Sequence, residues 1–253
     1  MAVRIFLSGC RGRMGRVISE IAAASDDLQI VAGSDINTSP ECAYPVFSDP
    51  SDCNVDFDVV VDFSNTAALP QLFAMIGQRC CPAVICTTGL NDQLKADLTE
   101  LSLSAPIFQS ANMSLGINLL ISLARQAASL LYPGFDIEII EAHHNQKLDA
   151  PSGTALMIAD EVNASLDGQM NLVCDRSQVR QKRDKKEIGM HAIRGGTIVG
   201  EHTVLFAGPE EILSIHHSAQ SRAVFARGAL AAARFMAGKP AGLYSMQDLL
   251  PKN

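Results

Sequence analysis

A glycine-rich turn near the N-terminus constrains the fold of this chain more than any other sequence feature. The segment GCRGRMG (9–15) directly follows a run of strand-forming residues, 3–8, and opens a helical stretch, 14–24. In this context glycines allow a tight turn and a close approach of the backbone to a phosphate, while helix N–H groups face the anion. The GxxGxxG spacing differs from the commoner GxGxxG, so a glycine-rich turn without a ligand is the alternative.

The first half of the chain alternates short β-rich runs with helical stretches whose apolar residues recur at intervals of three and four. The predicted strands span 3–8, 29–33, 58–62, 83–87 and 107–109, and the predicted helices span 14–24, 67–78 and 92–103. This alternation is typical of βαβ units. It predicts a doubly wound parallel sheet covered by helices on both faces.

The pattern changes after Asn112, where a second region begins. An apolar helix over 117–131 precedes a strand over 136–141, and three β-like runs follow between 189 and 218. Gly-Gly and Gly-Pro pairs separate these runs, which favours antiparallel hairpins or a meander. We expect an alanine-rich helix over 222–236 to return to the first region. The predicted domains are therefore 1–113 with 222–253, and 114–221.

Composition excludes several classes of protein. The 253 residues include 20 Lys and Arg and 27 Asp and Glu, a net charge of −7, which argues against a nucleic-acid or anionic-membrane partner. The most apolar long stretch, 113–131, contains Arg125 and two amides, so it indicates a buried helix rather than a membrane span. Seven cysteines without a CxxC pair, and no apparent secretion signal, favour a reduced cytoplasmic location.

Several polar residues lie at the predicted carboxyl ends of strands, where open α/β sheets bind ligands. Asp35 lies 20 residues after Gly15, where a carboxylate accepts hydrogen bonds from an adenosine ribose; a solvated turn aspartate is the alternative. No arginine follows Asp35 directly, which favours NADH, whereas the arginines of the glycine loop suit NADPH, so this preference stays open. The segments 87–89 and 110–113 follow two further strands, although ordinary turn residues have the same composition.

The segment from Glu141 to Ala155 carries the clearest chemistry. Ser152 is a candidate N-cap, so the N–H groups that follow it are expected to be available to a carboxylate. Lys147 and one of the adjacent histidines, His143 or His144, add positive charge and transferable protons. Neighbouring residues of an extended segment point to opposite sides, so we predict no metal site.

These residues can also be explained without a catalytic or binding role. An isolated histidine pair usually combines one buried and one surface residue, as we expect for His216 and His217. The six basic residues between Arg176 and Lys186 are either a flap over an acidic substrate or a solvated loop. The combination of Lys147, the capped helix start and the separate dinucleotide loop nevertheless favours hydride transfer to a carboxylated acceptor.

The motifs occur together in a known family, the 4-hydroxy-tetrahydrodipicolinate reductases, or dihydrodipicolinate reductases, of the diaminopimelate and lysine pathway. The chain resembles this family over nearly its whole length. The matching motifs are GCRGRMG (9–15), TTG (87–89), EAHH (141–144), KLDAPSGTA (147–155) and RGGTIVGEHTVLF (194–206).

The resemblance implies an α/β fold in which a Rossmann-type doubly wound parallel sheet is joined to a second α+β domain built on a mixed open sheet. It implies NADH or NADPH as cofactor, a small dicarboxylate as substrate, and a homotetramer built by the second domain. After loss of water, hydride would pass to a ring carbon conjugated with an imine.

The resemblance also implies residue roles. His143 is the acid-base residue, Lys147 is the proton donor, and His144, Gly153 and Thr154 hold a substrate carboxylate. The implied cofactor contacts are Gly9, Cys10, Arg11, Gly12, Arg13, Met14, Asp35, Cys86, Thr87, Thr88, Ser110, Ala111, Asn112 and Met113.

Three departures from the family pattern stand out: Cys86 replaces a usual glycine, Asn145-Gln146 replaces a more basic pair, and Ile36 replaces an arginine. Two other functions share the dinucleotide fold. An amino-acid or semialdehyde dehydrogenase would need a thiol or a different base, and 141–155 contains no cysteine. A redox sensor or scaffold is expected to lack the proton-transfer residues.

Overall fold

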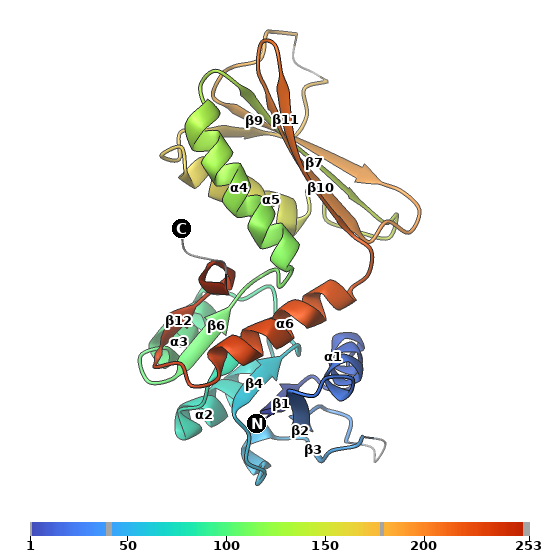
Figure 1. Cartoon of the computed structure of the whole chain (residues 1–253), viewed down its shortest axis with the longest axis vertical. Coiled ribbons are helices and arrows are strands. Elements are labelled where there is room, and N and C mark those ends of the chain that lie inside the picture. The colour runs from blue at the N-terminus through green and yellow to red at the C-terminus, as the bar shows by residue number, and fades with distance from the viewer. Residues whose placement is uncertain (1, 39–41, 178–179, 250–253) are drawn as a thin grey trace. The chain divides into compact units, whose positions relative to one another are not determined.

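The computed structural model describes residues 2–38, 42–177 and 180–249. The chain divides into two compact units (Figure 1). Unit 1 comprises Met1–Leu115 and Ala223–Asn253, and unit 2 comprises Gly116–Arg222.

Unit 1 is built on a parallel sheet of seven strands in the order β12-β6-β5-β4-β1-β2-β3. Its strands are β1 (Val3–Ser8), β2 (Leu28–Ser34), β3 (Val46–Phe47), β4 (Val59–Asp62), β5 (Ala83–Ile85), β6 (Pro106–Gln109) and β12 (Gly242–Tyr244). The predicted doubly wound sheet is confirmed. From β1 the chain goes first to one side, to β2, and then to the other, to β4, so the carboxyl ends of β1 and β4 form the switch point at which such sheets bind ligands.

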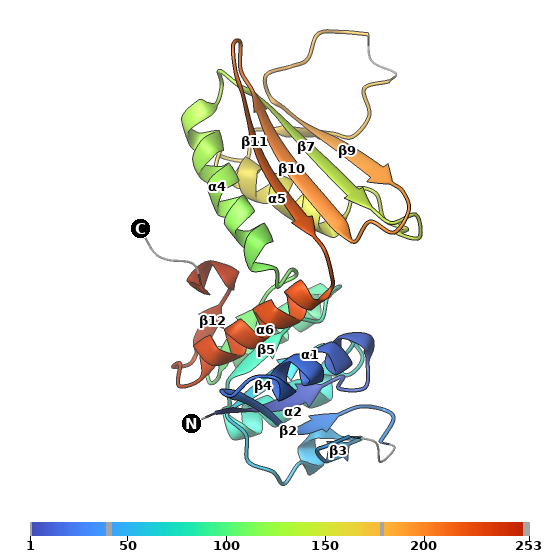
Figure 2. The ribbon, with the colours of Figure 1, turned by 45° about the vertical axis from the view of Figure 1, so that its right-hand side comes forward.

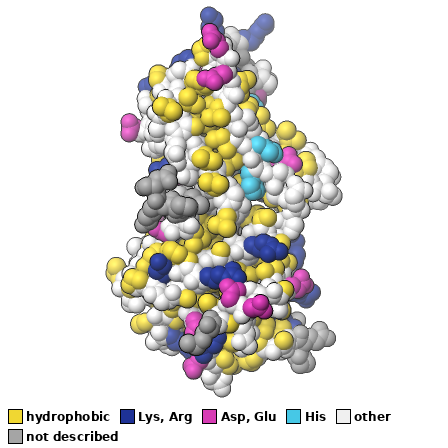
Figure 3. Space-filling view, in the orientation of Figure 1, with side chains coloured by type: hydrophobic (Ala, Val, Ile, Leu, Met, Phe, Trp, Pro, Cys, Tyr) yellow, Lys and Arg dark blue, Asp and Glu magenta, His cyan; other side chains and the backbone are white. Residues whose placement is uncertain are grey.

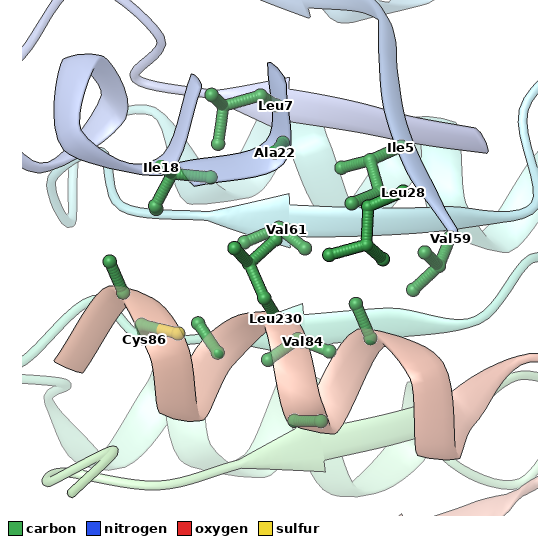
Figure 4. Packing of buried hydrophobic residues seen from close by; sticks show 14 of the residues in the cluster. Ile5, Leu7, Ile18, Ala22, Leu28, Val59, Val61, Val84, Cys86 and Leu230 are labelled. Carbon is green, nitrogen blue, oxygen red and sulfur yellow. The ribbon is translucent and has the colours of Figure 1, made fainter. Parts of the chain in front are cut away.

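Helices cover both faces of this sheet. They are α1 (Arg13–Ala23), α2 (Leu69–Arg79), α3 (Asp92–Leu101) and α6 (Ala223–Met236), with short 3₁₀ turns η1 (Pro50–Asp52) and η2 (Met246–Leu249). Ile18 of α1 and Leu230 of α6 pack against Val59 and Val61 in one core (Figure 4). Val60 joins a second core with residues of α2 and α3. Because both faces are covered, β4 is apolar at consecutive positions rather than alternate ones.

Unit 2 combines two long helices with a five-stranded mixed sheet. Its elements are α4 (Leu115–Leu131), β7 (Asp136–His143), α5 (Gly153–Ala164), β8 (Asn171–Val173), β9 (Glu187–Arg194), β10 (Gly200–Ala207) and β11 (Ile212–Ala219). The sheet order is β11-β10-β7-β9-β8, with β10 antiparallel to β7 and β11, and β9 parallel to β7 and β8. The predicted mixed sheet is confirmed. Helices α4 and α5 lie on one of its faces (Figure 2), and their apolar residues form one core with those of the sheet.

The expectation of a hairpin or meander over 189–218 is only partly correct. Strands β10 and β11 form a hairpin, but β7 lies between β9 and β10. The Gly-Gly pair instead forms a turn that bonds to the end of β7, since Gly195 N–H donates to the His143 carbonyl and Asn145 N–H donates to the Gly196 carbonyl. Turn residues indicate where a strand ends. Which strand pairs with it is determined by the other strands of the sheet.

The second face of the unit 2 sheet is open in the part of the chain that the structure describes. Along β10, His202, Val204 and Phe206 are buried, whereas the residues between them are only half-buried. α4 buries one side against the sheet and exposes leucines on the other, and Figure 3 shows apolar side chains gathered along it.

Within the described residues, we find no helix with both the length and the apolar character needed to cross a membrane.

Candidate functional site

The glycine turn of unit 1 has the geometry of an anion site. Gly9 has φ +73°, and a Cβ there would lie 2.6 Å from the Phe63 carbonyl oxygen. A Cβ on Gly15 would overlap the Gly9 carbonyl oxygen. α1 begins after Gly12, whose backbone is extended, and no side chain caps its first turn. The turn and the uncapped helix start therefore fit a pyrophosphate.

Asp35 lies at the end of β2 and is tied to the glycine loop. Its Oδ2 accepts a hydrogen bond from Arg11 N–H at 3.0 Å, and its Oδ1 accepts one from Asn37 N–H at 3.2 Å. A cavity of about 320 Å³ beside it is lined by Gly9, Asp35, Ile36, Ser64 and Asn65, among others. The described lining residues of this cavity include no Lys or Arg, whereas Arg16 and Arg11 line two other cavities of unit 1.

A buried carboxylate organises the loops at the switch point. Asp62, at the end of β4, accepts hydrogen bonds from the Thr87 hydroxyl at 2.6 Å and from the Ser64 hydroxyl at 2.5 Å. Burial raises the pKa of Asp62, and the hydroxyl donors oppose this shift. The predicted contact residue Thr87 therefore uses its hydroxyl to hold its own loop.

Four other predicted cofactor residues have structural side chains. The side chains of Cys10, Cys86 and Met113 are buried in the core beneath α1 and α6, and burial raises the pKa of Cys10 to about 12. Ser110 Oγ donates to the Asn112 carbonyl at 2.9 Å. Contacts from these residues to a cofactor would therefore come from the backbone. Among the remaining predicted residues, Gly12, Arg13, Thr88 and Ala111 are exposed.

In unit 2, the end of β7 carries a buried charged network. His143 Nδ1 lies 2.7 Å from Glu141 Oε2, and the Glu141 side chain is 0% exposed. Arg194 at the end of β9 donates to both Glu141 oxygens, at 2.8 and 2.7 Å. The Ser152 N–H donates to Glu141 Oε1 at 3.0 Å. Burial raises the pKa of Glu141, but the bonds from Arg194, His143 and Ser152 outweigh it and lower the pKa below its ordinary value.

The start of α5 is capped as the sequence predicts. Ser152 Oγ accepts a hydrogen bond from Ala155 N–H at 3.1 Å. Lys147 Nζ forms a 2.8 Å ion pair with Asp149 Oδ1. This pair, together with the Gly153 N–H, lowers the pKa of the Asp149 carboxyl.

His202 of β10 lies under this site. Its ring packs edge to face on that of His143, with centroids 5.2 Å apart, and its Nε2 is 3.2 Å from Ser152 Oγ. The same hydroxyl oxygen accepts the Ala155 N–H, so Ser152 links His202 to the cap of α5. Burial lowers the pKa of His202 to about 4, and the charges of His143 and Lys147 act in the same direction. His143 and Lys147 are thus within electrostatic range of His202.

The structure brings together His143, Lys147 and the helix start that carries Gly153 and Thr154, while the half-buried His144 bonds through its carbonyl to Lys147 N–H. Sequence reasoning missed Glu141, Arg194 and His202 as members of the site. One signal was present, because Glu141 shares the inward face of β7 with apolar residues, and a charge there needs partners.

The basic segment is anchored rather than free where the structure describes it. Arg183 pairs with Glu138 at 2.8 Å and with Asp136 at 3.2 Å. Lys185 also pairs with Asp136, and Arg176 pairs with Glu187. These contacts hold the segment to β7 and β9 and argue against a free flap. Gln178 and Val179 lie outside the described residues.

A doubly wound parallel sheet with an uncapped glycine turn, and a second unit with a buried acid-base network, define a two-domain nicotinamide-dependent oxidoreductase. Residues 3–113 match the family "Dihydrodipicolinate reductase, N-terminus", and residues 116–250 match "Dihydrodipicolinate reductase, C-terminus". The chain belongs to the dihydrodipicolinate reductase family.

Curated relatives and solved structures agree. The chain is 51% identical over 252 residues to the 4-hydroxy-tetrahydrodipicolinate reductase of Caldanaerobacter subterraneus, covering 100% of both chains. It is 49% identical to that of Clostridium botulinum, covering 98% of both. A dipicolinate-bound dihydrodipicolinate reductase from Paenisporosarcina sp. TG-14 has the same fold, with a TM-score of 0.83, 24% identity, and coverage of 99% of this chain and 100% of that one.

Family membership confirms the predicted reduction step in diaminopimelate and lysine biosynthesis and the predicted use of NAD(P)H. It also decides between the competing functions. The chain is an enzyme rather than a redox sensor or scaffold, and both curated relatives are 4-hydroxy-tetrahydrodipicolinate reductases rather than amino-acid or semialdehyde dehydrogenases.

Proposed function

We propose that this chain reduces 4-hydroxy-tetrahydrodipicolinate, with loss of water, to tetrahydrodipicolinate, and that unit 2 binds the substrate through its carboxylates. One observation carries this assignment to unit 2. The Asp149 carboxylate already lies against Lys147 Nζ, at 2.8 Å, and interacts with the Gly153 N–H at the start of α5. The same donors suit a carboxylate of a dianionic substrate, which would take the place of Asp149.

Unit 1, together with the loops at its switch point, is the proposed dinucleotide-binding part. Gly9, Gly12 and the first turn of α1 would hold the pyrophosphate, and Asp35 would hold the adenosine ribose. The bound nicotinamide supplies a hydride. The loops after β5 and β6, which include Thr88 and Ala111, would orient its ring through backbone groups.

The proton transfers are assigned to His143 and Lys147. Glu141 engages His143 Nδ1 at 2.7 Å, which leaves Nε2 as the atom that exchanges a proton during loss of water. Lys147, cationic beside Asp149, would protonate the enamine that remains after reduction. His144, Gly153 and Thr154 would complete the carboxylate site.

A coupled assay tests this function. A dihydrodipicolinate synthase generates the unstable substrate in place, and absorbance loss is followed with NADH and NADPH. We expect substrate-dependent oxidation of the cofactor. The variants His143→Ala and Lys147→Ala should lower kcat roughly 10²-fold or more while cofactor binding persists. Lys186→Ala, which removes an exposed lysine, is the matched control. No oxidation of either cofactor by folded protein would overturn the proposal.

We also propose a homotetramer that uses the open face of the unit 2 sheet. Ile193 and Ile212 are more than half exposed on two strands of that sheet, and a sheet face with apolar side chains is normally covered. Light scattering of the full chain measures the mass, and Ile193→Glu should reduce it.

A cytoplasmic location fits the seven cysteines, all of which are described and none of which is paired.

A further inference from the structure

We infer that Glu141 and Arg194 are positioning residues of this enzyme, which fix the tautomer of His143 and hold the loop that carries Lys147. The inference rests on the proposed roles of these two proton carriers. It assigns a function to the first residues of two matching motifs, EAHH and RGGTIVGEHTVLF, to which the resemblance gives no role.

Glu141 connects three separate elements through one carboxylate. It is 0% exposed and accepts hydrogen bonds from His143 on its own strand, from Arg194 on β9 and from Ser152 N–H at the start of α5. A buried carboxylate with four donors is held in one orientation. The imidazole and the cap of the carboxylate-binding helix are therefore positioned by the same group.

The carboxylate decides which nitrogen of His143 carries the proton. An ionised carboxylate only accepts hydrogen bonds, and the pKa of Glu141 is lowered, so Nδ1 must be the donor. In the neutral ring, Nε2 then has a lone pair for a substrate. Space around this atom is kept by Gly200, because a Cβ there would lie 3.1 Å from His143 Nε2.

Arg194 links the same carboxylate to the lysine loop. Besides its two bonds to Glu141, its Nη2 donates to the Asp149 carbonyl at 2.6 Å. The side chain of Asp149 in turn holds Lys147 Nζ. The next residue, Gly195, donates its N–H to the His143 carbonyl at 2.9 Å. One guanidinium thus sets the distance between the two groups that move protons.

The charged or titratable side chains around His143 come from three strands and one loop. Glu141 on β7 bonds to the ring and His202 on β10 packs on it, Arg194 on β9 bonds to Glu141, and Lys147 and Asp149 form an ion pair in the loop. Of these, only Glu141 accepts a hydrogen bond from the ring among the described contacts. A change of this one acceptor should therefore change the tautomer.

The opposite face of β7 offers a matched control. There Glu138 accepts hydrogen bonds from His191 Nε2 and from Arg183 Nε, both at 2.8 Å. Like Glu141, Glu138 thus bonds to one histidine and one arginine. The His191 side chain, however, is 50% exposed and lies on the other face of the sheet. Glu138→Gln removes the same charge from the same strand without touching the proposed acid-base residue.

The first test compares Glu141→Gln with Glu138→Gln in the full chain. ¹⁵N NMR of histidine-labelled protein reads the tautomer of each ring. In the wild type we expect His143 to be protonated on Nδ1. In Glu141→Gln the amide donates to Nδ1 and moves the proton to Nε2, and kcat should fall about 10²-fold or more, as expected when a base has the wrong tautomer. Glu138→Gln should keep the tautomer and lose less than about threefold in kcat.

The second test uses Arg194→Lys, which keeps the charge but loses the bidentate geometry. We expect His143 to stay protonated on Nδ1, and the KM for the dicarboxylate to rise about tenfold as the lysine loop loosens. This variant also covers the case in which Glu141→Gln does not fold, which circular dichroism would show.

The outcomes separate this inference from the proposed function. An unchanged tautomer in Glu141→Gln, or kcat and KM of Arg194→Lys equal to those of Glu138→Gln, would overturn the positioning roles. A tautomer switch in a protein that does not turn over the substrate even as wild type would support the positioning of His143 and refute the proposed reaction.

Discussion

The cavity beside Asp35 predicts that this enzyme prefers NADH over NADPH. The described residues that line it include one carboxylate and neither Lys nor Arg. The sequence has no Lys or Arg at all from residue 17 to residue 78. The residue that follows Asp35 is Ile36, which carries no charge and is 97% exposed. A 2′-phosphate in this cavity would meet a carboxylate without a compensating cation.

The size of the preference follows from Coulomb's law. For a phosphate charge of about −2, a distance of roughly 6 Å to Asp35 and an effective dielectric constant of about 60, the repulsion is about 2 kcal/mol. This energy corresponds to roughly a 30-fold difference in binding. We therefore expect kcat/KM with NADH to exceed that with NADPH by at least about tenfold at low salt.

The substitution Ile36→Arg tests this prediction by adding a cation beside Asp35. Ile36→Gln is the control, because glutamine adds length and polarity without charge. A guanidinium near the phosphate should offset about half of the repulsion or more, so the NADPH/NADH ratio should rise roughly tenfold. The coupled assay with both cofactors measures this ratio, and high salt should shrink it. A wild type that prefers NADPH, or equal ratios for the arginine and glutamine variants, would refute the reasoning.

Three further outcomes are expected. Ser152→Ala removes the cap of α5 and should lower the free energy of unfolding by about 1 kcal/mol or more in urea titrations; an unchanged midpoint would contradict the capping role. Burial lowers the pKa of His202 from 6.5 to about 4, so between these values the unfolded chain binds a proton that the folded chain does not. The free energy of unfolding should therefore fall by up to about 3 kcal/mol as pH drops through this window, and His202→Gln should flatten the slope. In native protein, a thiol reagent should modify the exposed Cys80 and Cys174 first, because burial keeps Cys10, Cys81 and Cys86 inaccessible and raises their pKa values; rapid reaction of all seven would refute this.

The sequence predicted the elements with strong periodicity and missed those that depend on distant partners. β1 lies at Val3–Ser8 as expected, and α6 begins within a residue of its predicted start. β3 and β12 have two and three residues, too few for a period to be visible, and they are strands only because a neighbouring strand pairs with them. The pairing of β9 with β7 could not be predicted either, because the turn that follows β9 does not indicate which strand lies beside it.

The candidate site shows the same division. The motif located His143, Lys147 and the Ser152 cap, all within a dozen residues of one another. Arg194 lies more than fifty residues beyond Glu141 in the chain, and their pairing depends on the register of β7 against β9. Sequence spacing carries no information on such a pair, whereas a single charge among inward apolar residues does indicate that a partner must exist.

Each unit has a buried carboxylate near the end of a strand, and the two carboxylates are stabilised by different partners. Asp62 ends a buried strand of unit 1, and Glu141 lies near the end of a strand of unit 2; each carboxylate ties neighbouring loops together. Burial raises the pKa of Asp62, and the hydroxyl and N–H groups that hold it offset this rise only in part. Glu141 faces a guanidinium, so its pKa falls and it stays ionised. A negative charge beside Nδ1 is what an acid-base histidine needs, whereas the Asp62 carboxyl accepts hydrogen bonds from the Ser64 and Thr87 hydroxyls and so holds two loops together.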